Sequence, residues 1–539
     1  MPALERADLA EQQVREWFMF SDRRSPAAFW LGCIGVVLGV LLHIPPFIAA
    51  GAMQYRMAGM PMGTPMLFGM ACILIGTMAA VYGLQPKAAT HSHGRAHERI
   101  VAPEEAPLTP WHWAACTALA VALAVDIMKV SSLGFVIPGM RTEYRLSAAQ
   151  VAVLPFAALM GATLGSFLWG ALADRYGRRA TILLAAVMFI GTSICGAMPS
   201  FAWNEFMCFL MGASAGGLLP VAYALLAEIM PTSHRGWSLV LVGGAGALGG
   251  YLAASGFSAL LQPHFGWRIM WFLNLPSGLM LITLAPLIPE SPRFLLHIGR
   301  PDEARATLER FGALMITPAA AGEQAPADED GRRPAALRSL IGTTMALGVA
   351  GLSWGFVNFG LLLWLPGELI AAGRNMGLAA ALLARSSLLA APVVIFAAVL
   401  YWRWSTKGAL LVMTAITAVG VLTLTLQQTG APATANPLLA PVLLIIGSTG
   451  VISILLPYAA ENYPLQVRGR ATGWVAGCSK AGGLICQGLG ALALVPPLRL
   501  SSAVTAAAVL LSLILIVCFG QETRGLDLRR LDRALIRSR

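Results

Sequence analysis

The sequence predicts an all-α integral membrane protein with fourteen membrane-spanning helices. Hydrophobic residues make up 57% of the 539 residues and charged residues only 12%, whereas soluble domains contain roughly 45–50% and 25%. The hydrophobic residues fall in blocks of about twenty, which at 1.5 Å per residue can cross a hydrocarbon core of roughly 30 Å. Backbone polar groups in lipid must be satisfied internally, and these blocks are too long for barrel strands. Each block is therefore predicted to be a helix.

The hydrophobic blocks divide the chain into seven segments. Two blocks lie at 27–50 and 64–85, and twelve lie between 111 and 520. A polar stretch rich in Arg, Pro, Asp and Glu separates these twelve into six and six. The predicted segments are a tail (1–26), an extra two-helix membrane segment (27–85), a linker (86–110), an N-terminal six-helix half (111–289), a central loop (290–340), a C-terminal six-helix half (341–520) and a second tail (521–539).

Positive charge predicts the orientation. If the N-terminus is inside and fourteen helices alternate, 28 of the 37 Lys and Arg residues fall in inside segments and 7 fall in outside loops. The outside count includes Arg385, at the start of the eighth core helix, which is predicted near 382–402. The asymmetry follows the positive-inside rule. We therefore expect a multi-pass protein of the cell membrane, most simply a bacterial inner membrane, with both termini and the central loop cytoplasmic.

The composition also excludes some functions. The net charge of +11 reflects topology and attraction to anionic headgroups, so we expect no nucleic-acid partner. The acidic N-terminal tail and the length of the first block argue against a cleaved signal peptide. The eight cysteines all fall in predicted helices without paired spacing, which is typical of packing residues, so we expect neither a metal nor a cofactor.

Two features repeat between the six-helix halves. The pattern E-x-x-P-x-x-x-R-G begins at Glu228 after the fourth core helix and again at Glu461 after the tenth, 233 residues later. Glu290 after the sixth helix and Glu522 after the twelfth are 232 residues apart. The halves run in the same direction, so an axis along the membrane normal should relate them. Solute sites in such folds lie between the repeats, near the middle of the membrane.

A short loop between the second and third core helices carries the most specific motif. It reads GALADRYGRR from Gly170 to Arg179 and resembles the signature loop of the major facilitator superfamily. The sequences PESPR at 289–293 and ETRG at 522–525, with both E-x-x-P-x-x-x-R-G runs, are similar to the sugar-porter type of that family. Charge flanking any inside helix end would explain the cations, but it does not explain the glycines and the aspartate.

The resemblance implies a transporter that works by alternating access and covers about residues 110–535. In the family, the signature loop latches one conformation, and nearby charges form a network that breaks as the halves rock. The residues that we expect to form this latch and network are Gly170, Asp174, Arg175, Gly177, Arg178, Glu228, Arg235, Glu290, Arg293, Glu461, Arg468 and Glu522.

This chain departs from the family pattern in three places. Cys208 stands where the family usually has an arginine in the fourth core helix, so the role of that cation does not transfer. Trp402 stands where the repeat of the signature loop should have an aspartate, so we expect the two halves to be latched unequally. The third departure is the pair of helices before residue 110. These helices can pack on the core or bind another protein.

Three ionisable residues lie deep in predicted helices, where a charge is costly unless it is paired or wet. Asp126 and Lys129 share one face of the first core helix. A carboxylate in a low-dielectric site can bind and release a proton near neutral pH, so these two residues are candidates for proton coupling. The alternative is a pair that merely neutralises itself. Lys480, in the eleventh core helix, has no acidic residue within four positions.

The resemblance suggests what Lys480 does. The order of features is most similar to metabolite–proton symporters and organic-ion transporters, in which a cation in the eleventh helix commonly faces an anionic substrate. We therefore predict a small organic anion, such as an aromatic carboxylate, although Lys480 could instead be structural. The candidates for the wall of the site, each of which could be an ordinary packing residue, are Tyr223, Trp354, Phe356, Asn358, Trp364 and Gln487.

The extra N-terminal segment contains a methionine-rich stretch, MQYRMAGMPMGTPMLFGM, at 53–70. Thioethers prefer soft metals such as Cu(I), and His43, His91, His93 and His97 flank the stretch. No cysteine joins the cluster, and three of the histidines fall on the predicted opposite side. Methionine as a flexible apolar filler is the favoured interpretation.

Other functions are possible within these observations. An exporter of drugs or metabolites would use the same cycle in the opposite direction, and a receptor without transport activity could use the N-terminal helices to contact a partner. An enzyme is not expected, because the chain has no nucleotide-binding loop, H-E-x-x-H or G-x-S-x-G motif. The expected partners are a small solute, a proton and the lipid bilayer, and the expected state is a monomer.

Overall fold

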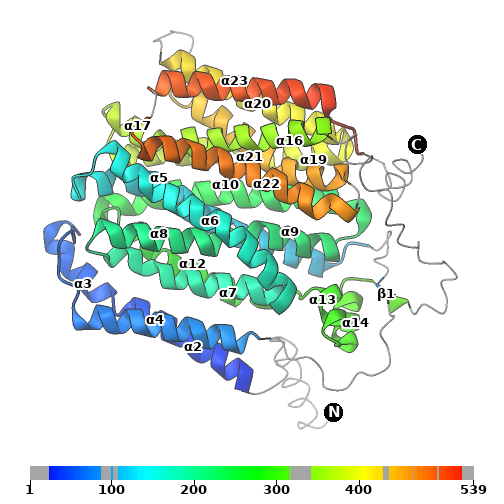
Figure 1. Ribbon diagram of the computed structural model, residues 1–539, viewed down its shortest axis with the longest axis horizontal. Coiled ribbons are helices and arrows are strands. Elements are labelled where there is room, and N and C mark those ends of the chain that lie inside the picture. Colours follow the sequence, from blue (N-terminus) through cyan, green and yellow to red (C-terminus); the bar gives the residue numbers. More distant parts are fainter. Residues whose placement is uncertain are drawn as a thin grey trace.

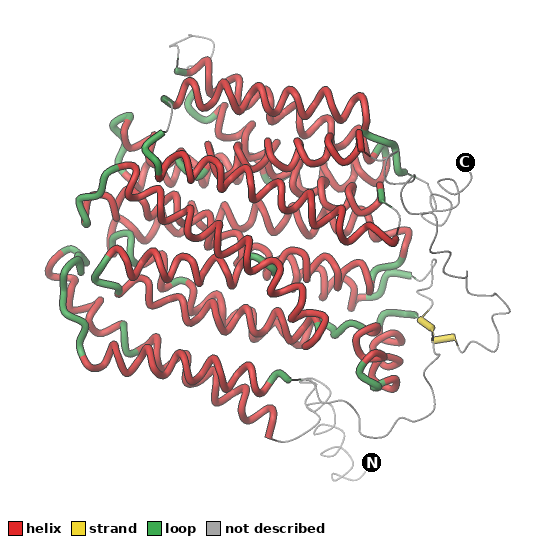
Figure 2. The backbone as a smooth tube through the Cα atoms, in the orientation of Figure 1, coloured by secondary structure: helices red, strands yellow, loops and turns green. Residues whose placement is uncertain are grey.

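The computed structural model describes residues 24–85, 99–100, 107–313, 315–316, 341–428, 436–463, 465–494 and 497–524 (Figure 1). Among these residues, thirteen helical segments are long and apolar enough to cross a membrane. The helix α22 (Leu465–Ala491) has the length of a fourteenth. The helices lie side by side, and the turns gather at two ends (Figure 2).

The N-terminal part of the chain forms the extra helices and the first half of the core. In chain order its elements are α2 (Arg24–Leu41), α3 (Ile44–Ala49), η1 (Ala50–Met53), α4 (Thr64–Gly83), β1 (Arg99–Ile100), α5 (Pro110–Glu143), α6 (Ala148–Tyr176), α7 (Arg178–Gly191), η2 (Thr192–Ala197), α8 (Phe201–Ala215), α9 (Leu218–Ile229), α10 (Thr232–Phe265), α11 (Ile269–Phe272), α12 (Asn274–Leu284) and η3 (Ala285–Leu287). We call α5–η3 the N-terminal half.

The remaining elements form a short connection and the second half of the core. They are α13 (Pro292–His297), α14 (Pro301–Arg310), β2 (Met315–Ile316), α16 (Ile341–Gly355), η5 (Phe356–Leu362), α17 (Leu365–Ala371), α18 (Met376–Ala390), α19 (Val393–Arg403), α20 (Thr406–Gln427), α21 (Leu439–Asn462), α22 and α23 (Leu498–Phe519). We call α16–α23 the C-terminal half. The strands β1 and β2 pair antiparallel.

The two ends of the bundle need names. The signature-loop end carries the turn at Gly177 between α6 and α7, and the hairpin end carries the turn at 54–63 between η1 and α4. Each predicted hydrophobic block corresponds to one helix or to two or three helical segments in succession, so the predicted fold class is confirmed. The structure shifts several of the predicted boundaries, and one shift bears on the count of outside charges. α18 begins at Met376, six positions before the predicted start, so Arg385 lies well inside the helix and does not belong with the outside loop.

Several spans are interrupted where the sequence supplies small or ring-constrained residues. The helix after Phe201 breaks between α8 and α9 at Gly216 and Gly217. The seventh core span passes through η5, a π-helix over Phe356–Leu362, and such segments often mark functional sites. The eighth breaks before Val393, next to Pro392, because proline cannot donate the backbone hydrogen bond that continues a helix.

Three groups of helix contacts join the halves. α6 packs on α22, α10 packs on α18, α19 and α21, and α5 packs on α17. Most of the buried hydrophobic side chains form two clusters, one largely within each half. The first cluster includes residues of the extra helices, such as Phe29 and Val36, so these helices share the core of the N-terminal half.

The extra helices α2 and α4 form a tight hairpin that packs on α7. A Cβ atom at Gly32 would lie 2.5 Å from the carbonyl oxygen of Gly76, and one at Gly39 would lie 2.5 Å from that of Gly69. Small residues allow this close approach, which is how helices commonly associate in membranes. Of the two possibilities left open by the sequence, the structure thus has the hairpin packed on its own core.

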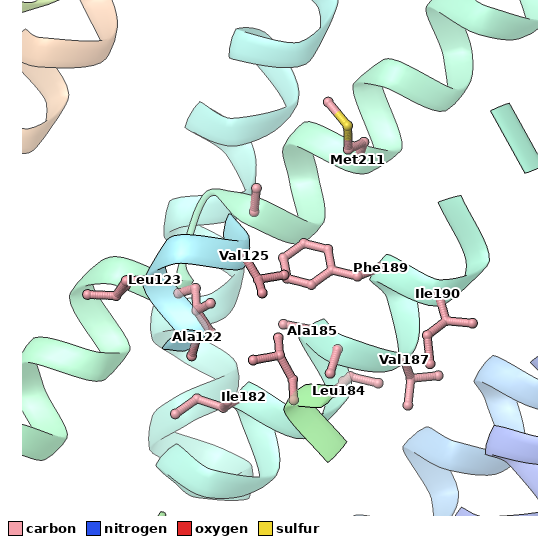
Figure 3. Close-up of a cluster of buried hydrophobic side chains, with 14 of the residues drawn as sticks. Ala122, Leu123, Val125, Ile182, Leu184, Ala185, Val187, Phe189, Ile190 and Met211 are labelled. Carbon is pink, nitrogen blue, oxygen red and sulfur yellow. The ribbon is translucent and has the colours of Figure 1, made fainter. Parts of the chain in front are cut away.

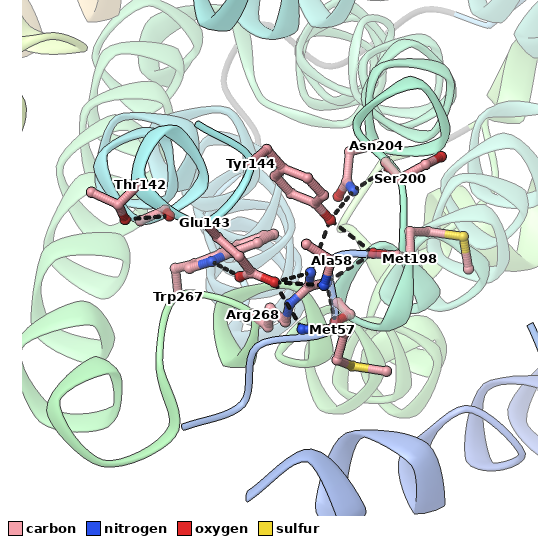
Figure 4. Close-up of polar contacts among 12 residues, drawn as sticks. Met57, Ala58, Thr142, Glu143, Tyr144, Met198, Ser200, Asn204, Trp267 and Arg268 are labelled. Atoms are coloured by element: carbon pink, nitrogen blue, oxygen red, sulfur yellow. Dashed lines mark hydrogen bonds and ion pairs between the residues drawn. The ribbon is translucent and has the colours of Figure 1, made fainter. Parts of the chain in front are cut away.

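The hairpin turn is anchored to a buried ion pair of the N-terminal half (Figure 4). Backbone N–H groups of Met57 and Ala58 donate to Glu143 Oε1 at 2.8 and 2.9 Å. The same oxygen accepts from Arg268 Nη2 at 2.7 Å, and the other carboxylate oxygen accepts from Trp267 Nε1 at 2.8 Å. The carboxylate at the end of α5 therefore joins the hairpin, α5 and the start of α11.

Two methionines of the stretch 53–70, one in the turn and one in α4, contribute to packing. Met57 and Met66 are only 2% and 3% exposed and belong to the hydrophobic cluster of the N-terminal half. His43 forms a hydrogen bond through Nδ1 with the Gly39 carbonyl, one helical turn away. These positions favour methionine as a filler over the copper-binding alternative. His91, His93 and His97 lie outside the described residues.

Replacing Glu143 by Ala should destabilise the protein strongly, because the fully buried Arg268 would lose its carboxylate. Breaking a buried pair of this kind costs about 3–5 kcal/mol. Thermal unfolding of purified protein in detergent measures the loss. Glu303→Ala is the matched control, since its pair with Arg300 is partly exposed and should contribute at most about 1 kcal/mol. Equal effects of the two substitutions would contradict the anchoring role of Glu143.

Candidate functional site

Lys480 reaches from the C-terminal half into the N-terminal half. Its ammonium group, on α22, donates to the carbonyl oxygens of Ala162 at 3.1 Å and Gly216 at 3.0 Å. It also donates to the hydroxyl of Ser166 on α6. All three of these acceptors are neutral. The cation predicted from the sequence therefore bridges the two halves, and no carboxylate of the described residues is bonded to it in this conformation.

The break between α8 and α9 creates one of these acceptors. A Cβ atom at Gly216 would lie 2.0 Å from the carbonyl oxygen of Ala162, and one at Gly217 would lie 2.0 Å from Cβ of Trp169. Only glycine lets the chain pass this close to α6. Since the helix stops here, the Gly216 carbonyl is available to Ser166 Oγ, which donates at 2.7 Å, and to Lys480.

Asp126 and Lys129 lie on one helix but do not form a hydrogen-bonded pair. Asp126 is 8% exposed and its Oδ1 has no hydrogen-bond partner among the described residues. Lys129 is 1% exposed, and its Nζ lies 3.0 Å from the centre of the Phe189 ring on α7. The geometry therefore does not favour the alternative of a pair that merely neutralises itself.

The two residues face different surroundings. Phe189 sits among apolar side chains of α5, α7 and α8, including Val125 and Met211, so Lys129 is directed into the N-terminal half (Figure 3). The charges that act on Asp126 are those of Lys129 and, from the opposite half, Lys480. Asp126 is thus a carboxylate whose charge interacts with a cation of its own helix and with the bridging cation of α22.

The predicted aromatic wall lies on and beside the π-helix η5. Trp354 donates from Nε1 to the Ser448 carbonyl at 2.9 Å, and its ring meets Phe359 edge-on with centroids 5.6 Å apart. Gln487 of α22 donates to the Phe359 carbonyl at 2.5 Å. Phe359 therefore contacts both Trp354 and Gln487. Phe359 is not among the residues predicted from the sequence to line the site.

The other residues predicted to line the site are half-buried, and their contacts are mainly packing contacts. Phe356, Asn358 and Trp364 have intermediate exposure, and Trp364 packs against the hydrophobic cluster of the N-terminal half. Tyr223 on α9 packs against Gly243 of α10, where a Cβ atom would lie 1.8 Å from its hydroxyl oxygen.

Several buried polar atoms between the halves lack hydrogen-bond partners in the described part of the chain. They include the hydroxyl groups of Tyr223 and Tyr251 and Oε1 of Gln487. Buried polar atoms in native structures almost always have a partner, whether protein, water or ligand. Together with Asp126 Oδ1, these atoms are polar groups that a solute could satisfy. Tyr251, on α10, has no distinguishing signal in the sequence.

The signature loop forms an ion-pair network within the N-terminal half. Arg178 Nη2 lies 3.5 Å from Asp174 and 3.3 Å from Glu228. The backbone N–H of Arg178 donates to Glu290 Oε1 at 2.6 Å, at the first turn of α7. The hydroxyl of Ser291 donates to the other oxygen of Glu228. Burial raises the pKa of Glu290 above its ordinary value, against the opposing pull of nearby backbone N–H groups.

Gly177 fits this network by conformation and by size. Its φ of +98° is unfavourable for residues with a side chain, and a Cβ atom would lie 2.4 Å from Glu290 Oε2. Gly170, the other glycine of the signature loop, has no described atom within 4 Å of the position that a Cβ atom would take. Only one of the two predicted loop glycines is therefore sterically required in this conformation.

The C-terminal half repeats the geometry with fewer charges. Glu522 accepts from the backbone N–H of Thr406 at 3.0 Å, at the first turn of α20, as Glu290 does at α7. The Thr523 hydroxyl donates to Glu461 at 2.7 Å, as Ser291 does to Glu228. Burial opposes the charge of Glu522, but hydrogen bonds from the hydroxyls of Ser405 and Thr406 and from backbone N–H groups outweigh it and lower the pKa to about 2.

The remaining residues predicted to form the latch do not take part in these two carboxylate networks in the same way. The side chains of Arg175 and Arg293 are exposed. Arg235 donates to the Met230 carbonyl at 3.5 Å, close to the end of α9. The side chain of Arg468 lies outside what the structure describes. The hydroxyl partners of the carboxylates, Ser291 and Thr523, are not selected from the sequence, because a hydroxyl beside a helix end has no distinctive pattern.

At the signature-loop end, an aromatic contact spans the halves. The ring of Trp402, at the end of α19, lies 6.2 Å from that of Trp237 on α10. Trp237 in turn lies 5.8 Å from Trp113 on α5. Trp402, which replaces the expected aspartate, therefore packs against the opposite half. The two halves thus use different contacts at this end, an ion-pair network in the first and an aromatic contact in the second.

Comparison with known proteins shows which family this architecture belongs to. Residues 119–487 match the family model described as Major Facilitator Superfamily. The niacin transporter NiaP of Acinetobacter baylyi is 25% identical over 392 residues, which cover 71% of this chain and 87% of that protein. The putative niacin/nicotinamide transporter NiaP of Bacillus subtilis is 26% identical over 406 residues, which cover 75% and 94%.

Solved structures agree on the fold. The proton:xylose symporter XylE bound to 6-bromo-6-deoxy-D-glucose superposes with a TM-score of 0.64 at 18% identity, covering 79% of this chain and 99% of that one. A partially occluded inward-open conformation of XylE from E. coli gives a TM-score of 0.62 at 16% identity, covering 78% and 100%. With its helical core, its signature loop and the match over residues 119–487, the chain belongs to the major facilitator superfamily of membrane transporters.

Proposed function

We propose that this chain transports a small organic carboxylate by alternating access and that a proton moves with the substrate. The observation that carries the proposal is the position of Lys480, whose ammonium group crosses between the halves and donates to three neutral acceptors. A carboxylate is a stronger partner for an ammonium group than a carbonyl or hydroxyl oxygen, because its full negative charge adds a direct Coulomb attraction that is large where the dielectric is low.

Substrate binding at Lys480 would change the contact between the halves. An anion that takes the ammonium group draws it away from Ala162, Ser166 and Gly216 and so releases α22 from α6 and from the break after α8. The energy of the new ion pair offsets the three lost hydrogen bonds. Occupancy of the site is thereby linked to the relative movement of the halves, which alternating access requires.

Asp126 supplies a reason for proton coupling. Its carboxylate is the negative group whose charge interacts with Lys480 from the opposite half. An ionised Asp126 competes with an anionic substrate for Lys480 and also repels the substrate. A protonated Asp126 does neither, so binding of the anion and binding of a proton favour each other. Such reciprocal coupling is the thermodynamic basis of symport.

The aromatic side chains favour a flat, ring-bearing substrate. Trp354 and Phe359 present ring edges and faces beside Gln487 of α22, the helix that carries Lys480. Niacin, named for both bacterial relatives, is a pyridine ring with one carboxylate. It combines the two features that such a site would recognise, and nicotinate is therefore the first substrate to test.

The same proposal covers location and topology. We place the chain in the cell membrane as a monomer, with the signature-loop end, both termini and the central loop in the cytoplasm. The excess of Lys and Arg in the segments that would lie there supports this orientation. The segments 1–26, 27–85, 86–110, 111–289, 290–340, 341–520 and 521–539 remain the proposed division of the chain.

Lys480→Ala should weaken the binding of nicotinate much more than that of its neutral amide, nicotinamide. Losing a hydrogen bond to a charged group costs about 1.5–3 kcal/mol, or roughly 10- to 150-fold in affinity. Calorimetric titration of both ligands measures the difference. Lys407→Ala, which removes a lysine at the signature-loop end bonded to the Val517 carbonyl, should leave both affinities unchanged. Equal losses for the two ligands in Lys480→Ala would count against the carboxylate.

Asp126→Asn should abolish accumulation driven by a pH gradient while exchange of internal for external substrate continues, because the amide cannot carry the proton. Proteoliposomes loaded with labelled nicotinate separate the two activities. Glu205→Gln, which neutralises a half-buried carboxylate on α8, should retain both. Concentrative uptake by Asp126→Asn at the rate of the unmodified protein would remove Asp126 from the coupling mechanism.

Gly177→Ala should destabilise the signature-loop end and slow transport, because the new Cβ would meet Glu290 and the backbone has a positive φ. The expected cost is about 1–2 kcal/mol, measured by thermal unfolding together with the exchange rate. Gly170→Ala is the matched control in the same loop and should cost less than about 0.5 kcal/mol. If the two variants behave alike, the Gly177 geometry does not constrain the latch.

A further inference from the structure

Arg385 lies on the lipid-facing side of α18. It is exposed, and the residues that share its face are large and apolar. Leu378, Leu388 and Leu389 are seven positions before it and three and four positions after it, and they are 61%, 59% and 60% exposed. Residues at these spacings lie on one face of a helix. The guanidinium therefore emerges from the middle of an apolar stripe that faces the bilayer.

The depth of Arg385 follows from the length of the span. The segment Met376–Arg403 has 28 residues and is about 42 Å long at 1.5 Å per residue. If it is centred on a hydrocarbon core of roughly 30 Å, about 6 Å extends beyond the core at each end. Arg385 lies nine residues after Met376, about 14 Å along the helix. Its Cα is therefore about 8 Å inside the hydrocarbon.

A charge at this depth needs a partner. No hydrogen bond or ion pair joins Arg385 to any other residue in the part of the chain that the structure describes. Helical side chains point toward the helix N-terminus, which for α18 is the hairpin end. A long arginine side chain can span several ångströms in that direction and reach the headgroup layer. The chemistry available there is the phosphate group of a phospholipid.

We propose that Arg385 binds the phosphate of an anionic phospholipid in the leaflet at the hairpin end. The planar guanidinium can donate two parallel hydrogen bonds to phosphate oxygens. The guanidinium carries a full positive charge, so it favours a headgroup of net negative charge over a zwitterionic one, whose own ammonium group it repels. Arg374, in the turn before α18, is a second cation at the same end and serves as a control.

Native mass spectrometry of the purified full chain tests this site without any transported substrate. The probes are phosphatidylglycerol and phosphatidylcholine with identical acyl chains. Arg385→Leu removes the charge and preserves the apolar face, so the variant should fold. Arg374→Ala removes a cation at the same end but outside the membrane. We expect the unmodified protein and Arg374→Ala to retain phosphatidylglycerol in preference to phosphatidylcholine, and Arg385→Leu to lose that preference.

Three outcomes would overturn the proposal. Arg385→Leu could retain phosphatidylglycerol as well as the unmodified protein does, which would leave Arg385 without a role. The unmodified protein could retain both lipids equally, which would remove the anionic preference. Arg374→Ala could lose phosphatidylglycerol as completely as Arg385→Leu, which would assign the effect to the general charge of this end. None of these results depends on which solute the protein transports.

Discussion

The absence of hydrogen-bonding partners in hydrocarbon governs this structure. Every backbone polar group within the membrane must find a partner in the protein, and continuous helices achieve this without further help. Where a helix stops, a carbonyl group becomes available. The break at Gly216 is the clearest case, because its carbonyl oxygen accepts from Ser166 and from Lys480 of the opposite half. The same requirement that makes the chain helical thus provides the bridge between its halves.

The halves share a plan but differ in chemistry. In each, a carboxylate caps the first turn of a helix, Glu290 at α7 and Glu522 at α20, and a hydroxyl supports a second carboxylate. The first half adds a cation, Arg178, between two carboxylates. The second has Thr406 at the helix start and Trp402 against the opposite half. An ion network and an aromatic contact respond differently to salt, since screening weakens exposed charges but not apolar packing.

Much of the fold follows from the sequence, and the reasons for the exceptions are specific. Long apolar blocks and the signature loop identify the helices and the family. The ion pair of Glu143 and Arg268 joins residues 125 positions apart, and no local pattern connects them. The acceptors of Lys480 include backbone carbonyls, which carry no residue signature. Arg385 is counted with an outside loop because the predicted span begins only three residues before it, whereas α18 begins six residues earlier, at Met376.

The hairpin of α2 and α4 is fixed to one half only. It packs on α7 and is bonded through its turn to Glu143, so it shares the core of the N-terminal half. Two added helices enlarge that half's perimeter in the bilayer and the viscous drag on its rotation. When two bodies of unequal drag rock against each other, the smaller one turns further. The C-terminal half, which carries Lys480, would then turn through a larger share of the angle than its partner.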